Sequence, residues 1–227
     1  MRPKTVRVTR FALLTALALV LGYFDRAIPI TMLLSGAVPG IKLGLANTVL
    51  LYGVYLMNWQ SCMILMLAKV VLSGLLYGSM SAILYSLSGG VLSLITMLLM
   101  KKNPRAGALS IAALAALSDA MLLRRNPAPR GQMLWCVILI ALACLASIAA
   151  WIFIRRNPDY DVIGTSLAGA VAHNVGQMLV ASSVLRTPQL LMTYLPVLVG
   201  IGAAVGCLTG FIAQRVFKAL RLLPSAP

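Results

Sequence analysis

Residues 38–49 read VPGIKLGLANTV, and they join a break in the chain to the start of a long apolar segment. Pro39 and Gly40 end whatever precedes them, because proline lacks the backbone N–H and glycine adds backbone freedom. Lys42 then falls in the first turn of the next predicted helix, where the helix dipole disfavours a cation. Asn47 lies well inside the apolar run, so its amide needs hydrogen-bond partners there. Both side chains are therefore candidates for a functional site.

Each of these two residues also has a structural explanation. Lys42 could extend to lipid phosphates at the membrane surface. Asn47 could form a hydrogen bond to a neighbouring helix. The two residues are five positions apart, about 140° around a helix, so they face one point only if the turn at residues 40–44 is irregular.

The composition indicates a membrane protein. The 227 residues are 61% hydrophobic and only 10% charged, whereas soluble domains carry about a quarter charged residues. Apolar runs of about 20 residues recur, and each is long enough to cross the hydrocarbon core of a bilayer. We therefore predict an all-α polytopic membrane protein in which residues 1–227 form a single membrane domain.

The charges are strongly unbalanced. The chain has nineteen Lys and Arg residues but only four acidic residues, and the basic residues cluster between apolar runs. This pattern is typical of the positive-inside bias and of contact with anionic lipids, and it argues against nucleic-acid binding. No Asp-rich pair is available to hold magnesium and a diphosphate, and no carboxylate pair for acid–base chemistry. We expect no metal and no cofactor, and we expect the four cysteines, all within apolar runs, to be buried.

The order of apolar segments predicts core helices at about 11–24, 41–57, 61–85, a shorter one ending at 101–102, then 162–185 and 190–213. We expect the first helix to be retained rather than cleaved, ending in a local Asp25–Arg26 pair. Residues 29–40 are expected to pack over a cavity as a lid. Basic residues at both chain ends predict cytoplasmic termini in a bacterial cell membrane. Residues 107–123 and 133–154 predict an additional hairpin, which gives eight crossings.

Small and polar residues mark the helical faces that should meet. Ala12 and Ala16 form a smooth strip, suited to a partner helix or to internal packing. Lys69 lies near the middle of the 61–85 helix. On the 162–185 helix, His173 and Gln177 share a face beside a stripe of small residues, and Asn174 is adjacent. A histidine in this setting is more often a helix–helix hydrogen-bond partner than a ligand or catalyst, so both interpretations stay open.

Three segments resemble the Gx transporter family, also described as heptaprenyl diphosphate synthase component I. They are PGIKLGLAN at 39–47, LYSLSGGVLS at 84–93 and GAVAHNVGQ at 169–177. That family is similar to the substrate-binding S components of energy-coupling-factor transporters. The resemblance covers residues 8–102 and 160–217, and it implies a six-helix core into which residues 103–160 are inserted. Lys69 stands where the family leads us to expect arginine.

The resemblance also implies a function and a partner. It places a substrate site between the first loop and the later helices, and it implies that Ala12 and Ala16 dock on a transmembrane coupling subunit. The sequence has no GxxxxGK[ST] loop, so energy from ATP would come from separate partner ATPases. Lys42, Lys69 and His173 outnumber the acids that could pair with them, so a small anionic substrate would supply the missing charge.

We therefore expect a membrane subunit that binds or transports a small anionic molecule. Lys42 and Lys69 would bind the anionic group of this molecule. Four further side chains would orient the molecule through hydrogen bonds: Asn47, His173, Asn174 and Gln177. The alternative is a non-catalytic membrane component associated with heptaprenyl diphosphate, and thus isoprenoid or menaquinone, synthesis. An intramembrane enzyme is disfavoured, because no Ser–His–acid set, zinc ligand cluster or paired carboxylate is visible.

Overall fold

The computed structural model describes residues 3–27, 44–77, 80–103, 113, 161–187, 191 and 194–220. These residues form six α-helices and no strand, so the predicted all-α fold class is confirmed. The helices are α1 (Pro3–Ala27), α3 (Asn47–Leu56), α4 (Trp59–Tyr77), α5 (Met80–Lys102), α8 (Asp161–Val184) and α10 (Leu195–Ala219). Lys42, the predicted lid and nearly all of the predicted insertion lie outside the described residues.

Four of the described helices are long and apolar enough to cross a membrane: Thr5–Asp25, Trp59–Leu76, Met80–Lys102 and Val197–Ala219. The chain is thus a polytopic helical membrane protein. α3 has ten residues and is only about 15 Å long, too short to cross a bilayer alone. It begins at Asn47, six residues later than the helix predicted for 41–57.

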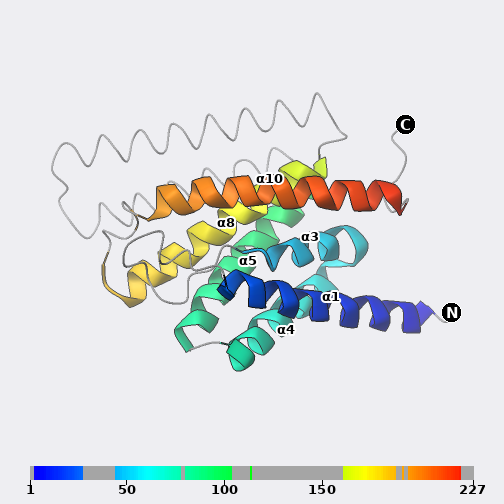
Figure 1. Ribbon diagram of the computed structural model, residues 1–227, viewed down its shortest axis with the longest axis horizontal. Helices are drawn as coiled ribbons and strands as arrows, with labels where there is room; N and C mark the ends of the chain where they lie inside the picture. The colour runs from blue at the N-terminus through cyan, green and yellow to red at the C-terminus, as the bar shows by residue number, and fades with distance from the viewer. Residues whose placement is uncertain are drawn as a thin grey trace.

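α8 lies between α5 and α10, and it is buried along most of its length (Figure 1). The small residues of its sequence make this possible. A Cβ atom at Gly206 of α10 would lie 2.9 Å from the Cα of Leu167, and one at Gly210 would lie 2.9 Å from the Cα of Ile163. These glycines of α10 therefore let the backbones of α10 and α8 approach closely, whereas Gly176 of the predicted α8 stripe faces Gly89 and Ser88 of α5. Because neighbouring helices cover α8, its buried polar side chains, such as His173, Asn174 and Gln177, do not face lipid.

Hydrogen bonds join α3, α5 and α8 at one end of the molecule. The hydroxyl of Tyr55 donates to the carboxylate of Asp161 over 2.6 Å, and Nζ of Lys101 donates to the carbonyl of Val54 over 2.7 Å. Of the two described cysteines, Cys62 is buried but Cys207 is exposed. The expectation that all cysteines are buried is wrong for Cys207, because an apolar side chain of a membrane helix can equally face lipid.

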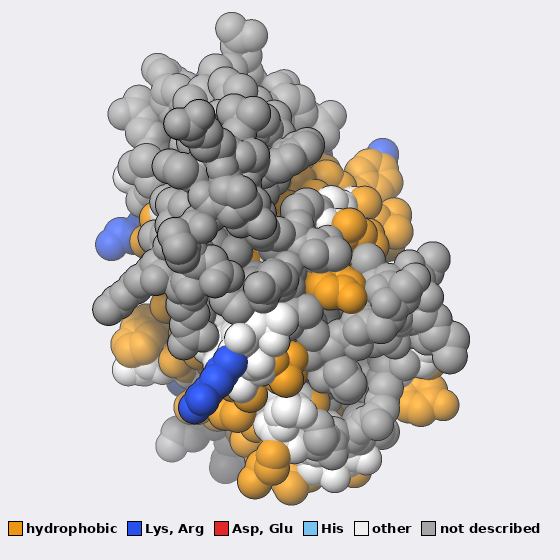
Figure 2. Space-filling model, turned by 90° about the vertical axis from the view of Figure 1, so that its left-hand side faces the viewer, with side chains coloured by type: hydrophobic (Ala, Val, Ile, Leu, Met, Phe, Trp, Pro, Cys, Tyr) orange, Lys and Arg blue, Asp and Glu red, His pale blue; other side chains and the backbone are white. Residues whose placement is uncertain are grey.

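α1 lies at the edge of the helix assembly, and it begins at the end of the molecule where α10 finishes (Figure 1). Leu14 and Ala18 of α1 are buried, whereas Ala12 and Ala16 are exposed. Much of the described surface in Figure 2 is hydrophobic, and no acidic side chain is visible among its described residues. An apolar surface of this kind is expected where a protein meets lipid rather than water.

Candidate functional site

Asp25, at the end of α1, caps the start of α3. Its two carboxylate oxygens accept hydrogen bonds from the backbone N–H of Leu45 at 2.9 Å and of Ala46 at 3.1 Å. The first N–H groups of a helix have no partner within the helix, and the helix dipole favours an anion near them. Ala46 occupies the N-cap position and supplies no side-chain cap. Asp25 therefore stabilises α3 from a neighbouring helix.

The sequence analysis missed this role, because it paired Asp25 with Arg26, whose side chain lies outside the described residues. A signal was nevertheless present. α3 begins without Ser, Thr, Asp or Asn just before its first residue, and an acid ends the preceding described helix. A helix that lacks its own cap, next to a helix that ends in a carboxylate, predicts a cap of this kind.

Lys69 and Asn47 form a buried pair. Nζ of Lys69, in the middle of α4, donates to Oδ1 of Asn47 over 2.6 Å. Lys69 is 6% exposed and Asn47 is 2% exposed. A buried charge is expensive unless hydrogen bonds and an opposite charge stabilise it. The hydrogen bond to Asn47 offsets part of this cost, and Nδ2 of Asn47 has no hydrogen-bond partner among the described residues.

The imidazole of His173 lies between two glycines from different elements. A Cβ atom at Gly44 would lie 3.0 Å from Cδ2 of His173, and one at Gly89 of α5 would lie 2.7 Å from Nδ1. Gly44 also has φ = +87°, a conformation that other residues rarely adopt. Both glycines let the backbone approach the ring closely. They fix the position of His173, which is 3% exposed.

Gln177 and Asn174 face different neighbours. A Cβ atom at Gly89 would also lie 2.9 Å from Cγ of Gln177, so the predicted shared face of His173 and Gln177 is confirmed, and it packs against α5. Asn174 instead donates from Nδ2 to the carbonyl of Leu198 on α10 over 2.6 Å. The structure therefore places Asn174 at the α8–α10 contact rather than with the other predicted site residues.

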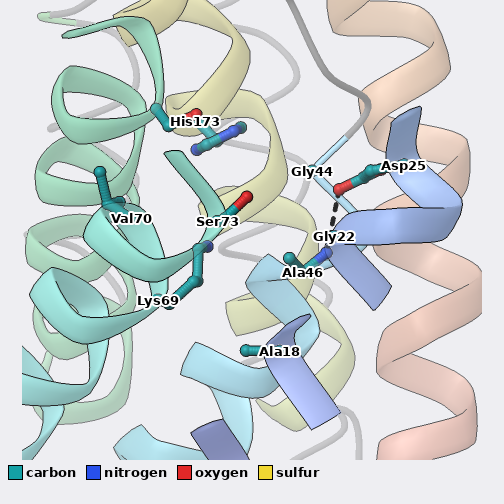
Figure 3. Close-up of a pocket in the computed structure, with 10 residues that line it drawn as sticks. Ala18, Gly22, Asp25, Gly44, Ala46, Lys69, Val70, Ser73 and His173 are labelled. Carbon is teal, nitrogen blue, oxygen red and sulfur yellow. Dashed lines mark hydrogen bonds between the residues drawn. The ribbon is translucent and has the colours of Figure 1, made fainter. Parts of the chain in front are cut away.

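A small polar cavity lies where these elements meet (Figure 3). Asp25, Lys69, Ser73 and His173 surround it, together with Ser86 of α5 and small residues of α1 and of the turn before α3. Its volume of about 20 Å³ accommodates a single water molecule. Ser73 follows Lys69 by one helical turn and so shares its face, a spacing that could have identified it.

Two basic side chains and one carboxylate line this cavity. The carboxylate of Asp25 already accepts two backbone hydrogen bonds from α3. Asp25 was predicted to form a local pair with Arg26, and the structure buries its side chain beside the same cavity as Lys69 and His173. The arrangement can hold a small polar or anionic group by hydrogen bonds from Lys69, Ser73 and His173.

The family model for heptaprenyl diphosphate synthase component I matches residues 14–122 and 128–216. The chain belongs to this family. The match includes Asp25, Lys69 and His173, and it runs through most of residues 103–160. Comparisons with curated proteins and with solved structures gave no match.

The name of the heptaprenyl diphosphate synthase component I family denotes one component of a larger assembly, which is consistent with a partner subunit. The predicted docking residues are placed where a partner could reach them. Ala12 and Ala16 lie on the exposed face of α1, opposite the face through which Leu14 and Ala18 join the core. The choice between partner docking and internal packing is left to the mutational test of this strip.

Proposed function

We propose that this member of the heptaprenyl diphosphate synthase component I family is a non-catalytic membrane subunit that binds a small anionic molecule in the cavity beside Lys69. The observation that carries the proposal is a small buried cavity lined by Lys69, Ser73 and His173, whose side chains can donate hydrogen bonds to a ligand. An ionisable side chain at membrane depth is a candidate for substrate binding, because its burial is otherwise costly.

In this proposal, Lys69 donates to a carboxylate or phosphate oxygen of the ligand, and Asn47 holds the ammonium group in place. His173 and Gln177 orient the ligand by hydrogen bonds. Lys42, predicted from the sequence as a second cation, belongs to the proposal on sequence grounds alone. Asn174 is assigned a structural contribution, because it is hydrogen bonded to α10.

The size of the cavity requires a conformational change for binding. Pockets for small-molecule ligands enclose about 300–1,000 Å³, whereas this cavity encloses about 20 Å³. Residues of α1 and of the turn before α3 lie on one side of the cavity in Figure 3, and residues of α4 and α8 lie on the other. Ligand entry therefore requires the two walls to separate, with Asp25 keeping α1 attached to the start of α3.

The transport role follows from the resemblance to S components. In this proposal the protein lies in the bacterial cell membrane with both termini in the cytoplasm, and Ala12 and Ala16 contact a coupling subunit. Separate ATPases bound to that subunit would supply the energy. The chain itself carries no nucleotide-binding loop.

A second candidate function is a non-catalytic membrane component of heptaprenyl diphosphate synthesis, and the family match favours it. Partner identity separates the two functions. Isolation of the tagged protein with a coupling subunit and ATPases would support the transport role. Isolation with a prenyl diphosphate synthase subunit would support the second candidate.

Ligand binding is tested by identifying small molecules that co-purify with the protein, using mass spectrometry of denatured samples. We expect wild type and Lys69→Arg to retain the same anionic molecule, and Lys69→Met to lose at least about nine tenths of it. That loss corresponds to ~1.4 kcal/mol, the scale of a lost charged hydrogen bond. Equal retention by Lys69→Met and wild type would refute a binding role for this lysine.

A further inference from the structure

A second and larger cavity lies towards the opposite ends of α1 and α3. It encloses about 410 Å³ between the first turns of α1, the end of α3 and the start of α4. Along α1 it is about 20 Å from the cavity that contains Lys69. The two cavities share no lining residue. The buried polar site therefore does not account for this second cavity.

The polar part of this cavity is basic. Arg7 and Arg10 line it from α1, three positions apart and so on neighbouring parts of one helix face. None of the described residues that line it is acidic. The nearby carboxylate of Asp161 accepts a hydrogen bond from Tyr55. Two guanidinium groups beside one cavity favour a phosphate or diphosphate, since each can donate two parallel hydrogen bonds to its oxygens.

The rest of the lining is partly apolar. Val6, Leu56 and Met57 form an apolar wall, and Asn58 and Ser61 lie at the start of α4, where Oδ1 of Asn58 accepts from the N–H of Ser61 at 3.3 Å. Both arginines are exposed, so the cavity reaches the surface. A charged opening with an apolar wall suits an amphiphile better than a fully hydrated ion.

We propose that this cavity binds the phosphate or diphosphate group of an amphipathic lipid. Arg7 and Arg10 hold the phosphoryl oxygens, and Val6, Leu56 and Met57 contact the first part of the hydrocarbon chain. The ligand has two possible sources: an anionic phospholipid of the surrounding membrane or a prenyl diphosphate. This inference rests on the second cavity and not on the cavity beside Lys69, and its prenyl diphosphate source would extend the second candidate function.

The experiment measures binding to the full chain in phosphatidylcholine nanodiscs. Farnesyl diphosphate and phosphatidylglycerol are the two phosphate probes, and farnesol is the uncharged control. The test variant is Arg7→Gln/Arg10→Gln. The matched control is Lys102→Gln/Arg215→Gln, which removes two positive charges from exposed positions outside the cavity, at the ends of α5 and α10. Titration gives the affinity for the prenyl probe, and native mass spectrometry gives retention of the phospholipid.

We expect the Arg7→Gln/Arg10→Gln variant to bind at least one phosphate probe about tenfold more weakly, with helix content unchanged because both side chains are exposed. The control pair should change binding by less than about twofold, since distant surface charges are screened by salt. The probe that shows the loss identifies the source of the ligand. Equal losses in both variants would attribute binding to overall charge and overturn the proposal. The proposal would also be overturned if the wild-type protein bound neither phosphate probe. The same holds if it bound farnesol as tightly as farnesyl diphosphate.

Discussion

Buried polar residues form the core of the candidate site. Lys69 and Asn47 are paired from α4 and α3, and Asp25 joins α1 to the start of α3. Each of these contacts links residues at least 20 positions apart. They tie three helices together around a single small cavity. Polar side chains thus contribute to helix association here as well as to the proposed binding of a ligand.

The cap formed by Asp25 is tested by Asp25→Asn. The amide has one accepting oxygen in place of two and no charge, so the backbone N–H of Leu45 or of Ala46, just before α3, loses its partner. We expect the unfolding free energy in detergent to fall by about 1–2 kcal/mol, measured as a lower midpoint of thermal or denaturant unfolding. The control is Thr15→Val on the same helix, whose hydroxyl donates only to the carbonyl of Phe11 one turn earlier. Equal effects of the two substitutions would contradict the capping role.

Close contact of α5 with α8 depends on Gly89. A Cβ atom there would lie 2.7 Å from both Nδ1 and the carbonyl oxygen of His173. We expect Gly89→Ala to lower the unfolding free energy by about 1–3 kcal/mol and to weaken ligand binding by displacing His173. Gly200→Ala on α10 is the matched control, because nothing lies within 4 Å of its added Cβ. That substitution should be neutral or stabilising by up to ~1 kcal/mol. A neutral result at Gly89 would show that the two helices can separate without cost.

The exposed strip on α1 is tested by Ala12→Leu/Ala16→Leu. Both residues are exposed on α1, so the fold and ligand binding should be unaffected, while co-purification of a partner subunit should be lost. Val20→Leu, at a position of α1 that is 53% exposed, controls for added bulk on the same helix. A loss of thermal stability with no loss of partner would indicate internal packing and contradict docking through this strip.

The sequence predicted which residues share a helical face better than it predicted which neighbouring helix that face contacts. The i, i+4 spacing of His173 and Gln177 predicts a shared face, and the structure shows it against α5. The same pattern did not reveal that Asn174, one position along, faces α10. The predicted break at Pro39–Gly40 lies outside the described residues, and Gly44, just before α3, has positive φ. Asp25 was missed because its partners are 20 and 21 residues away, a relationship that local patterns do not contain.

At the scale of the whole molecule, α8 is the helix most protected from lipid. α5 and α10 cover it, so its sequence can combine small residues with His173, Asn174 and Gln177. The described helices that are apolar enough to span a membrane are its neighbours and the outer helices α1 and α4. This distribution explains why composition alone predicted the fold class correctly. A membrane helix with polar side chains, such as α8, is tolerated only where neighbouring helices cover those side chains.

The membrane topology is tested by labelling single cysteines introduced into a cysteine-free variant with a reagent that cannot cross the membrane. If residues 103–160 cross the membrane twice, Lys102→Cys should be labelled from the cytoplasm and Ala128→Cys from outside. Arg124, Arg125 and Arg130 would then lie outside, against the usual charge bias. Labelling of Ala128→Cys from the cytoplasmic side alone would exclude the hairpin.

The most direct test of the central claim is a cryo-electron microscopy structure of the protein with its co-purified ligand. The proposed site predicts an enlarged cavity between α1, α3, α4 and α8, with an anionic group of the ligand about 3 Å from Nζ of Lys69. Density for the ligand elsewhere, with the Lys69–Asn47 pair intact and the cavity at its present size, would contradict it.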